Sequence, residues 1–154
     1  MSKANVSAGP HYQALLQLLR TSETLWNSSR IFFAQWDISP SQFNILNVLT
    51  DQPEGLTQIE LSRLLIMHRS NVTGLVDRLE ERKLIQRKQN PNDRRAYRVV
   101  LTTAGRKLVE KILPDYYRAA EEIWGDFPIT RTKALMKDLV QLSENVEKFS
   151  AHLK

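Results

Sequence analysis

The hydrophobic pattern of this chain changes from a helical period to strict alternation and back within residues 56–105, which limits the folds it can adopt. Residues 57–83 carry apolar side chains at three- and four-residue intervals, in two blocks that a tight turn separates. In the next segment Tyr97, Val99 and Leu101 alternate with other residues, which is typical of a strand. The chain must therefore place a β-hairpin directly after two short, closely joined helices.

Two capping boxes mark where short helices begin. Ser39 with Gln42, and Thr57 with Glu60, have the spacing at which a hydroxyl and a side-chain carbonyl cap each other's backbone N–H groups. The helix after Thr57 is expected to turn four apolar residues inward, Ile59, Leu61, Leu64 and Leu65. The helix over residues 69–83 is expected to bury one stripe, Val72, Leu75, Val76 and Leu79.

Long helices are predicted on both sides of this region. Apolar residues recur at helical spacing over residues 12–36, and Thr102 or Thr103 is expected to cap another long helix. A last helix starts near Thr130, and its apolar residues step by 4, 3, 4, 3 and 4 positions. They are Leu135, Leu139, Leu142, Val146, Phe149 and Leu153. A seam of this kind needs a partner helix, from the same chain or from another subunit.

These elements predict a mostly α protein with a small β-hairpin (α+β), arranged as a winged helix-turn-helix with flanking helices. With 154 residues, the chain is long enough for one domain with a real core. It has no cysteine, which excludes disulfides and thiol chemistry, and no window approaches the ~18 apolar residues of a membrane span. A cytoplasmic protein without membrane association is expected.

The positive charge of the chain is local. Residues 60–98 hold ten Lys and Arg against five Asp and Glu, whereas the remainder holds twelve of each, so this segment accounts for the formal charge of +5. Clustered cations suit a nucleic-acid surface because they neutralise phosphates and release counterions. A basic face that is merely solvated is the alternative.

The start of the helix expected over residues 69–83 offers groups that can read bases. Arg69 can donate two hydrogen bonds to guanine, Asn71 can pair with adenine, and the Thr73 methyl can touch thymine. The backbone N–H groups of residues 68–71 would face phosphate oxygens. The alternative is a polar helix face in water.

The basic tip of the hairpin, NPNDRRA, offers a minor-groove contact. Asp93 could hold one guanidinium while the other probes the narrow groove, and the sequence does not decide between Arg94 and Arg95. A solvated turn is the alternative, which the position between two strand patterns disfavours.

The runs NVTGLVDRLEERKLI and NPNDRRAYRVVLT, within residues 56–105, resemble the MarR family of dimeric winged-helix regulators. The resemblance implies that Arg69, Ser70, Asn71 and Thr73 read bases and that Asp93 and Arg95 form the wing contact. His68 stands where the family helix usually opens with Ser. The full set of DNA-binding candidates is His68, Arg69, Ser70, Asn71, Thr73, Arg78, Lys88, Asp93, Arg94 and Arg95.

The same resemblance implies a homodimer that binds a pseudo-palindrome in double-stranded DNA, with residues 39–101 as the DNA-binding domain and residues 1–38 and 102–154 for dimerisation. The family tendency favours a repressor over an activator. It also raises the hypothesis of release by a small aromatic or phenolic ligand. The candidate ligand residues are Trp26, Arg30, Phe33, Trp36 and Phe43. Core packing is the alternative for the aromatic residues, and a surface salt bridge for Arg30.

The parts of an enzyme are missing from the sequence. Its five glycines are at least 19 residues apart, so it has no phosphate-binding glycine loop, and its three histidines lack metal-ligand spacing. No catalytic residue, cofactor or metal is therefore expected. An architectural DNA-binding or adaptor dimer remains the alternative function, and the operator, the regulated genes and the effector stay open.

Overall fold

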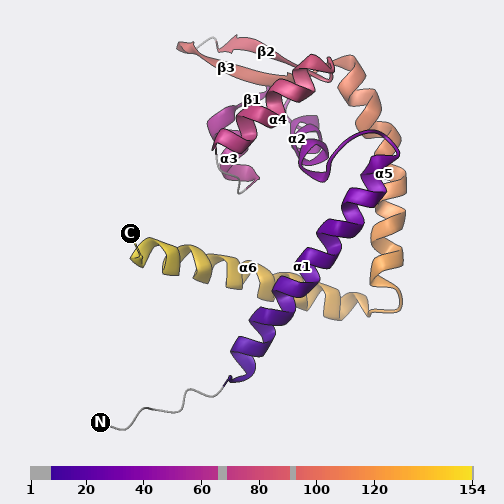
Figure 1. The fold of residues 1–154 in the computed structure, drawn as a ribbon, viewed down its shortest axis with the longest axis vertical. Coiled ribbons are helices and arrows are strands. Elements are labelled where there is room, and N and C mark those ends of the chain that lie inside the picture. Colours follow the sequence, from indigo (N-terminus) through magenta and orange to yellow (C-terminus); the bar gives the residue numbers. More distant parts are fainter. Residues whose placement is uncertain (1–7, 66–68, 91–92, 154) are drawn as a thin grey trace. The chain divides into compact units, whose positions relative to one another are not determined.

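The computed structural model describes residues 8–65, 69–90 and 93–153. Within these ranges the chain forms six helices and three strands (Figure 1). They are α1 (Pro10–Ala34), α2 (Pro40–Thr50), β1 (Leu56–Thr57), α3 (Gln58–Leu64), α4 (Arg69–Glu81), β2 (Ile85–Asn90), β3 (Asp93–Leu101), α5 (Thr103–Trp124) and α6 (Ile129–His152). The predicted class, mostly helical with a small antiparallel sheet, is confirmed.

The chain divides into two compact units, with the boundary inside α5 after Lys111. The core of the first unit lies among α2, α4 and the sheet. Its fully buried side chains include Phe43, Leu46, Leu49, Val72, Val76, Leu79, Ile85 and Val99. The stripe predicted for α4 is thus the buried face of that helix, and the remaining faces of α4 are left for other contacts.

Both predicted capping boxes are present. Ser39 Oγ accepts a hydrogen bond from the Gln42 backbone at 3.2 Å, and Gln42 Oε1 accepts one from the Ser39 backbone at 2.9 Å. At α3, Thr57 Oγ1 accepts from the Glu60 backbone at 3.2 Å, and Glu60 Oε2 accepts from the Thr57 backbone at 2.7 Å. Each box satisfies N–H groups that the helix itself leaves without partners, so both helix starts are fixed locally.

The α3 cap gives a pH-dependent contribution to stability. Hydrogen bonds from the backbone and then the hydroxyl of Thr57 lower the pKa of Glu60 from its usual 4.5, and they outweigh the raising effect of burial. A carboxyl with a lowered pKa stabilises the fold above its unfolded pKa and stops doing so as the pH falls through the folded value. We expect Glu60→Gln to unfold more easily than wild type at pH 7, by about 0.5–1 kcal/mol. In urea titrations this difference should disappear as the pH falls below 4.5, and a constant difference would contradict it.

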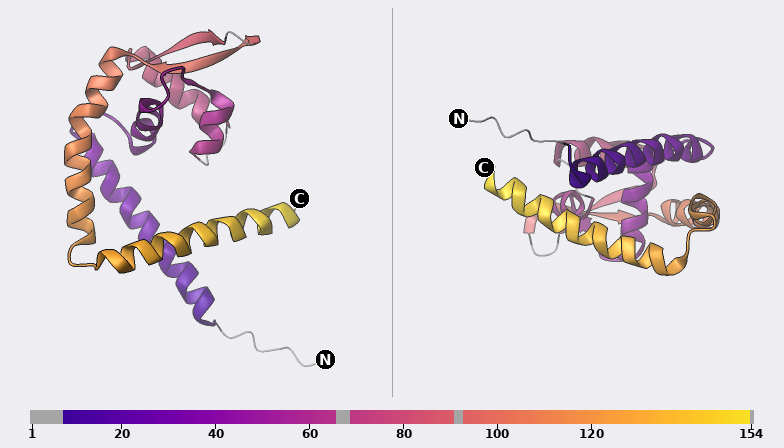
Figure 2. Two further views of the ribbon diagram at one scale, coloured as in Figure 1. Left: turned by 180° about the vertical axis from the view of Figure 1, so that it is seen from behind. Right: turned by 90° about the horizontal axis from the view of Figure 1, so that it is seen from below.

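The sheet has three strands in the order β1-β3-β2, all antiparallel. The sequence analysis missed β1, whose Leu56 lies opposite Val99. It also placed residues 90–96 in a long loop, whereas β2 extends to Asn90 and β3 begins at Asp93. The strands are longer than their composition suggests because each backbone finds its hydrogen-bond partners on the other strand. Figures 1 and 2 show this two-stranded ribbon projecting past α3 and α4.

The inward face predicted for α3 was too wide. Leu61 is buried, but Ile59 and Leu64 are 43% and 58% exposed. Ile59 lies two residues before Leu61 and therefore on another side of the helix, whereas Leu64 is the last residue of this seven-residue helix.

The second unit consists of the C-terminal part of α5 and the whole of α6. No residue of α6 is buried, and its predicted seam is exposed along its length, from 37% at Leu139 to 72% at Leu153. No helix in the described ranges is both long enough and apolar enough to cross a bilayer. The seam is therefore an apolar face without an intramolecular cover in its own unit.

Candidate nucleic-acid interface

The buried stripe of α4 decides which of its residues face outward. Val72, Val76 and Leu79 are fully buried, so Ser70 and Asn71, which lie on other faces, are exposed. Thr73 is half-buried at the edge of the stripe. Three of the residues expected to read bases thus lie along the first half of one helix, with their side chains on its outer and flanking faces.

Part of the expected DNA-binding set is not described. His68 lies outside the described residues. Arg69 is the first residue of α4, while Asp93, Arg94 and Arg95 open β3, and for these four only the backbone is described. The backbone therefore puts the two expected cationic elements at the start of α4 and at the start of β3.

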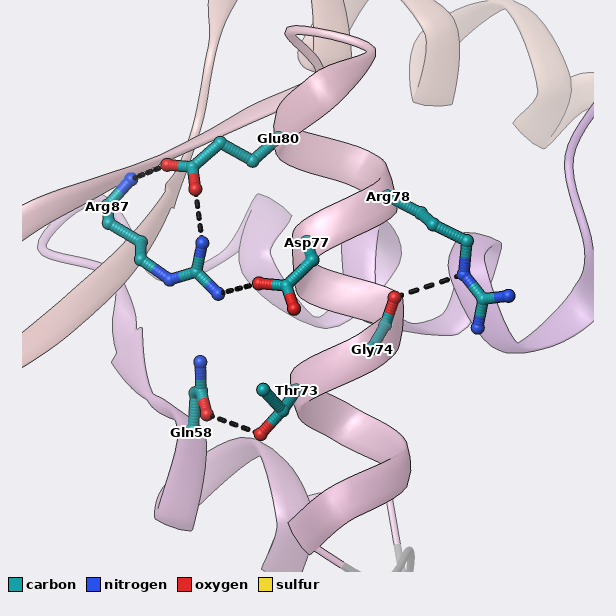
Figure 3. A network of polar contacts seen from close by, with 7 residues as sticks. All are labelled: Gln58, Thr73, Gly74, Asp77, Arg78, Glu80 and Arg87. Atoms are coloured by element: carbon teal, nitrogen blue, oxygen red, sulfur yellow. Dashed lines mark hydrogen bonds and ion pairs between the residues drawn. The ribbon is translucent and has the colours of Figure 1, made fainter.

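Figure 3 shows the polar contacts along α4. Thr73 Oγ1 donates a hydrogen bond to Oε1 of Gln58, the first residue of α3, at 2.9 Å. On another face, Arg78 Nε donates to the Gly74 carbonyl oxygen at 3.0 Å. The Arg78 side chain therefore folds back along the helix toward its N-terminal half, beside the predicted base-reading residues.

Arg87 reaches from β2 to two carboxylates of α4. Its guanidinium forms ion pairs with Asp77 and Glu80, and its backbone N–H donates to Glu80 Oε1 at 2.8 Å (Figure 3). Burial by itself lowers the pKa of Arg87, but the hydrogen bonds and charges of both carboxylates raise it above the usual value. Arg87 thus ties the hairpin to α4 and offsets half of the negative charge of the two acidic groups on that helix.

Two further arginines of the basic segment also serve the fold. Arg98 Nε donates to the Glu54 carbonyl oxygen at 2.8 Å, and Arg82 binds the carbonyl oxygen and, at 3.5 Å, the carboxylate of Asp37. Lys88, by contrast, is exposed on β2 opposite Arg98. The local charge excess in the sequence thus includes arginines that hold the domain together, as well as cations available to a ligand.

The aromatic ligand candidates lie in two settings. The rings of Phe33 and Phe43 are buried and stack with centroids 4.6 Å apart, so both contribute to the core. Trp36 is half-buried and packs on Phe32 at 5.2 Å, whereas Trp26 is 42% exposed on α1. Since Phe32 also lies 5.0 Å from Phe33, three of the four candidate rings belong to one aromatic cluster.

Arg30 is the one ligand candidate that lines a described hollow. This hollow, of about 280 Å³, lies between the end of α1 and the start of α2. Its lining residues are Arg30, Ala34, Asp37, Ile38, Ser39, Pro40 and Gln42. Asp37, on its wall, is the residue that Arg82 holds, which connects the hollow to the end of α4.

Comparison with known proteins finds similarity to one family of DNA-binding regulators. Residues 36–96 match the sequence profile of the MarR family. The transcriptional repressor MprA of Escherichia coli (strain K12) is 29% identical over 147 residues, which cover 88% of this chain and 83% of MprA. The chain is thus similar to MarR-family proteins in sequence over residues 36–96. The curated relatives that it matches are named as transcriptional repressors and regulators.

Two solved MarR-like structures share the fold. An S. aureus MepR–DNA complex superposes with a TM-score of 0.76 at 25% identity, over 87% of this chain and 97% of MepR. The second is Bordetella bronchiseptica BpsR, whose DNA binding is regulated by 6-hydroxynicotinic acid. It gives a TM-score of 0.69 at 25% identity, over 82% of this chain and 98% of BpsR. The family match begins just after α1, ends within β3, and so includes α4 and the start of the hairpin's second strand.

Proposed function

We propose that this protein is a homodimeric repressor of the MarR family that binds a pseudo-palindromic operator in double-stranded DNA. The observation that carries the proposal is α4, whose buried stripe leaves Ser70 and Asn71 exposed beside a projecting basic hairpin. In this proposal residues 39–101 bind DNA, and residues 1–38 and 102–154 form the dimer. Repression is supported by the likeness to the repressor MprA.

Base reading is assigned to the first half of α4. An Arg69 guanidinium can donate to guanine O6 and N7, and an Asn71 amide can pair with adenine in the major groove. Arg94 and Arg95 lie on the strand that would reach a neighbouring minor groove, with Asp93 available to hold one of them. A dimer repeats this set in a second half-site ~34–36 Å away.

Dimerisation is assigned to the exposed apolar faces of the long helices. On α6, Leu139 and Leu142 are 37% and 38% exposed at consecutive seam positions, and on α1 Leu15 and Leu19 are 47% and 57% exposed. Burial of these apolar side chains against the same helices of a second copy stabilises a dimer. Such a homodimer needs no other protein as a partner.

Substitutions of two arginines test the DNA proposal. Arg69→Ala should relax the preference for the operator, at a cost of about 1–3 kcal/mol, because a base contact is lost. Arg95→Ala should weaken binding to all duplexes alike and reduce the salt dependence, since a phosphate-region cation is lost. Fluorescence anisotropy against salt, with operator and unrelated duplex, measures both effects. Unchanged profiles in both variants would contradict the proposal.

A small aromatic or phenolic acid is proposed as the releasing ligand, by analogy with BpsR and its 6-hydroxynicotinic acid. Arg30 lines the hollow between α1 and α2 and would bind the carboxylate, while Ile38 and Pro40 supply apolar wall.

The Arg30→Ala variant tests the ligand proposal. It should keep operator affinity near the wild-type value but need at least about tenfold more ligand for half-maximal release, because a charged hydrogen bond is lost. DNA release measured with a panel of benzoic and nicotinic acids checks this. Full responsiveness of the variant to every ligand that releases wild type would contradict the assigned role of Arg30.

A further inference from the structure

Gln58 is not among the residues predicted to bind DNA, but its side chain joins α3 to α4. Gln58 is the first residue of α3, and its Oε1 accepts a hydrogen bond from Thr73 Oγ1 at 2.9 Å. Figure 3 shows the amide oxygen turned toward Thr73 and the amide nitrogen turned away from it. The hydrogen bond from Thr73 therefore engages the oxygen of the Gln58 amide and sets the orientation of its nitrogen.

The other end of this amide carries two N–H donors. Gln58 is half-buried, so the amide is neither enclosed in the core nor lost to free rotation in water. Thr73, which orients it, lies on the same half of α4 as the exposed residues Ser70 and Asn71. A fixed donor pair thus stands beside the face that is proposed to read bases.

The position of α3 indicates which part of the DNA this donor would meet. When the second helix of a helix-turn-helix enters the major groove, the first helix crosses the sugar-phosphate backbone. Glutamine is among the side chains that donate to phosphate oxygens in such interfaces. The acidic residue of the same turn, Glu60, is directed back onto Thr57 at 2.7 Å and is engaged in the helix cap.

We propose that Gln58 is a further DNA-contacting residue, which donates from Nε2 to a DNA phosphate oxygen and is oriented for this by Thr73. The inference rests on the proposed function, because it requires α4 to enter the major groove. A neutral donor to phosphate adds affinity on every sequence alike and releases no counterion of its own.

The experiment compares Gln58→Ala, Thr73→Val and the double variant with wild type, on the selected operator and on an unrelated duplex across a salt series. Gln58→Ala should lose about tenfold in affinity on both duplexes with an unchanged salt slope. Thr73→Val keeps a methyl group but lacks the hydroxyl, so it should lose part of this affinity. The double variant should lose no more than Gln58→Ala, because both changes remove the same contact.

Gln52→Ala is the matched control, since Gln52 is an exposed glutamine in the turn before β1, and it should bind as wild type does. Thermal unfolding checks that each variant is folded. Wild-type affinity in Gln58→Ala, a loss confined to the operator, or additive losses in the double variant would each overturn the proposal. A wild-type protein without measurable affinity for any duplex would overturn the proposed function, and this contact with it.

Discussion

The Leu139→Glu variant is expected to be monomeric and to bind operator DNA more than about 100-fold more weakly than wild type. Leu139 lies in the middle of the α6 seam, where it is 37% exposed and where no residue of the helix is buried. A carboxylate there would be buried against apolar side chains in the dimer, at a cost of several kcal/mol for each subunit. Each separated subunit would then bind one half-site without the gain in effective concentration that linkage provides.

Sedimentation equilibrium and DNA anisotropy on the same samples measure both parts of this prediction. Gln141→Glu is the control, since it adds the same charge to an exposed polar position of α6 two residues away. It should remain dimeric and bind DNA as wild type does. A dimeric Leu139→Glu protein with full operator affinity would contradict the assignment of the seam to dimerisation.

The Arg87→Ala variant is expected to lose both stability and DNA affinity. Its side chain is only 23% exposed and pairs with Asp77 and Glu80, which are 51% and 36% exposed. Removal of the cation breaks the ion pairs between β2 and α4. Because these pairs are partly buried, the loss of folding stability should be about 1–2 kcal/mol, between the values for exposed and for buried pairs. It also leaves two uncompensated carboxylates on the helix proposed to approach phosphates, which should weaken DNA binding by at least about tenfold.

Two further variants separate these effects. Lys88→Ala removes an adjacent exposed cation and should weaken DNA binding modestly without loss of stability. Asp77→Asn with Glu80→Gln in the Arg87→Ala background removes the repulsion and should recover DNA affinity, while the lost stability is not restored. Urea unfolding and DNA anisotropy measure these outcomes. An Arg87→Ala protein as stable as wild type would show that the ion pairs do not hold α4.

Features encoded within a few neighbouring residues could be predicted from the sequence. The caps at Ser39 and Thr57 depend on a partner three residues away, and the stripe from Val72 to Leu79 depends only on the helical period. Features that depend on a distant strand could not. β1 is two residues long and is a strand only because β3 lies beside it, and the hairpin continues into a segment whose composition is typical of a turn.

The candidate interface shows the same division. The exposure of Ser70 and Asn71 follows from the α4 stripe. The engagement of Arg87 was missed because a count of charges does not say which cations have partners. A signal was available, since Arg87 lies two residues after the buried Ile85 and therefore on the inward face of β2. Gln58 had no such signal, because its contact with Thr73 joins residues fifteen positions apart.

The most direct measurement is selection of bound duplexes from a random DNA library at near-physiological salt, together with the mass of the protein in solution. The proposed repressor predicts an enriched pseudo-palindrome, with half-sites about one helical turn apart, bound by a dimer. Salt-sensitive binding with no enriched sequence would contradict it and would indicate an architectural DNA-binding protein instead.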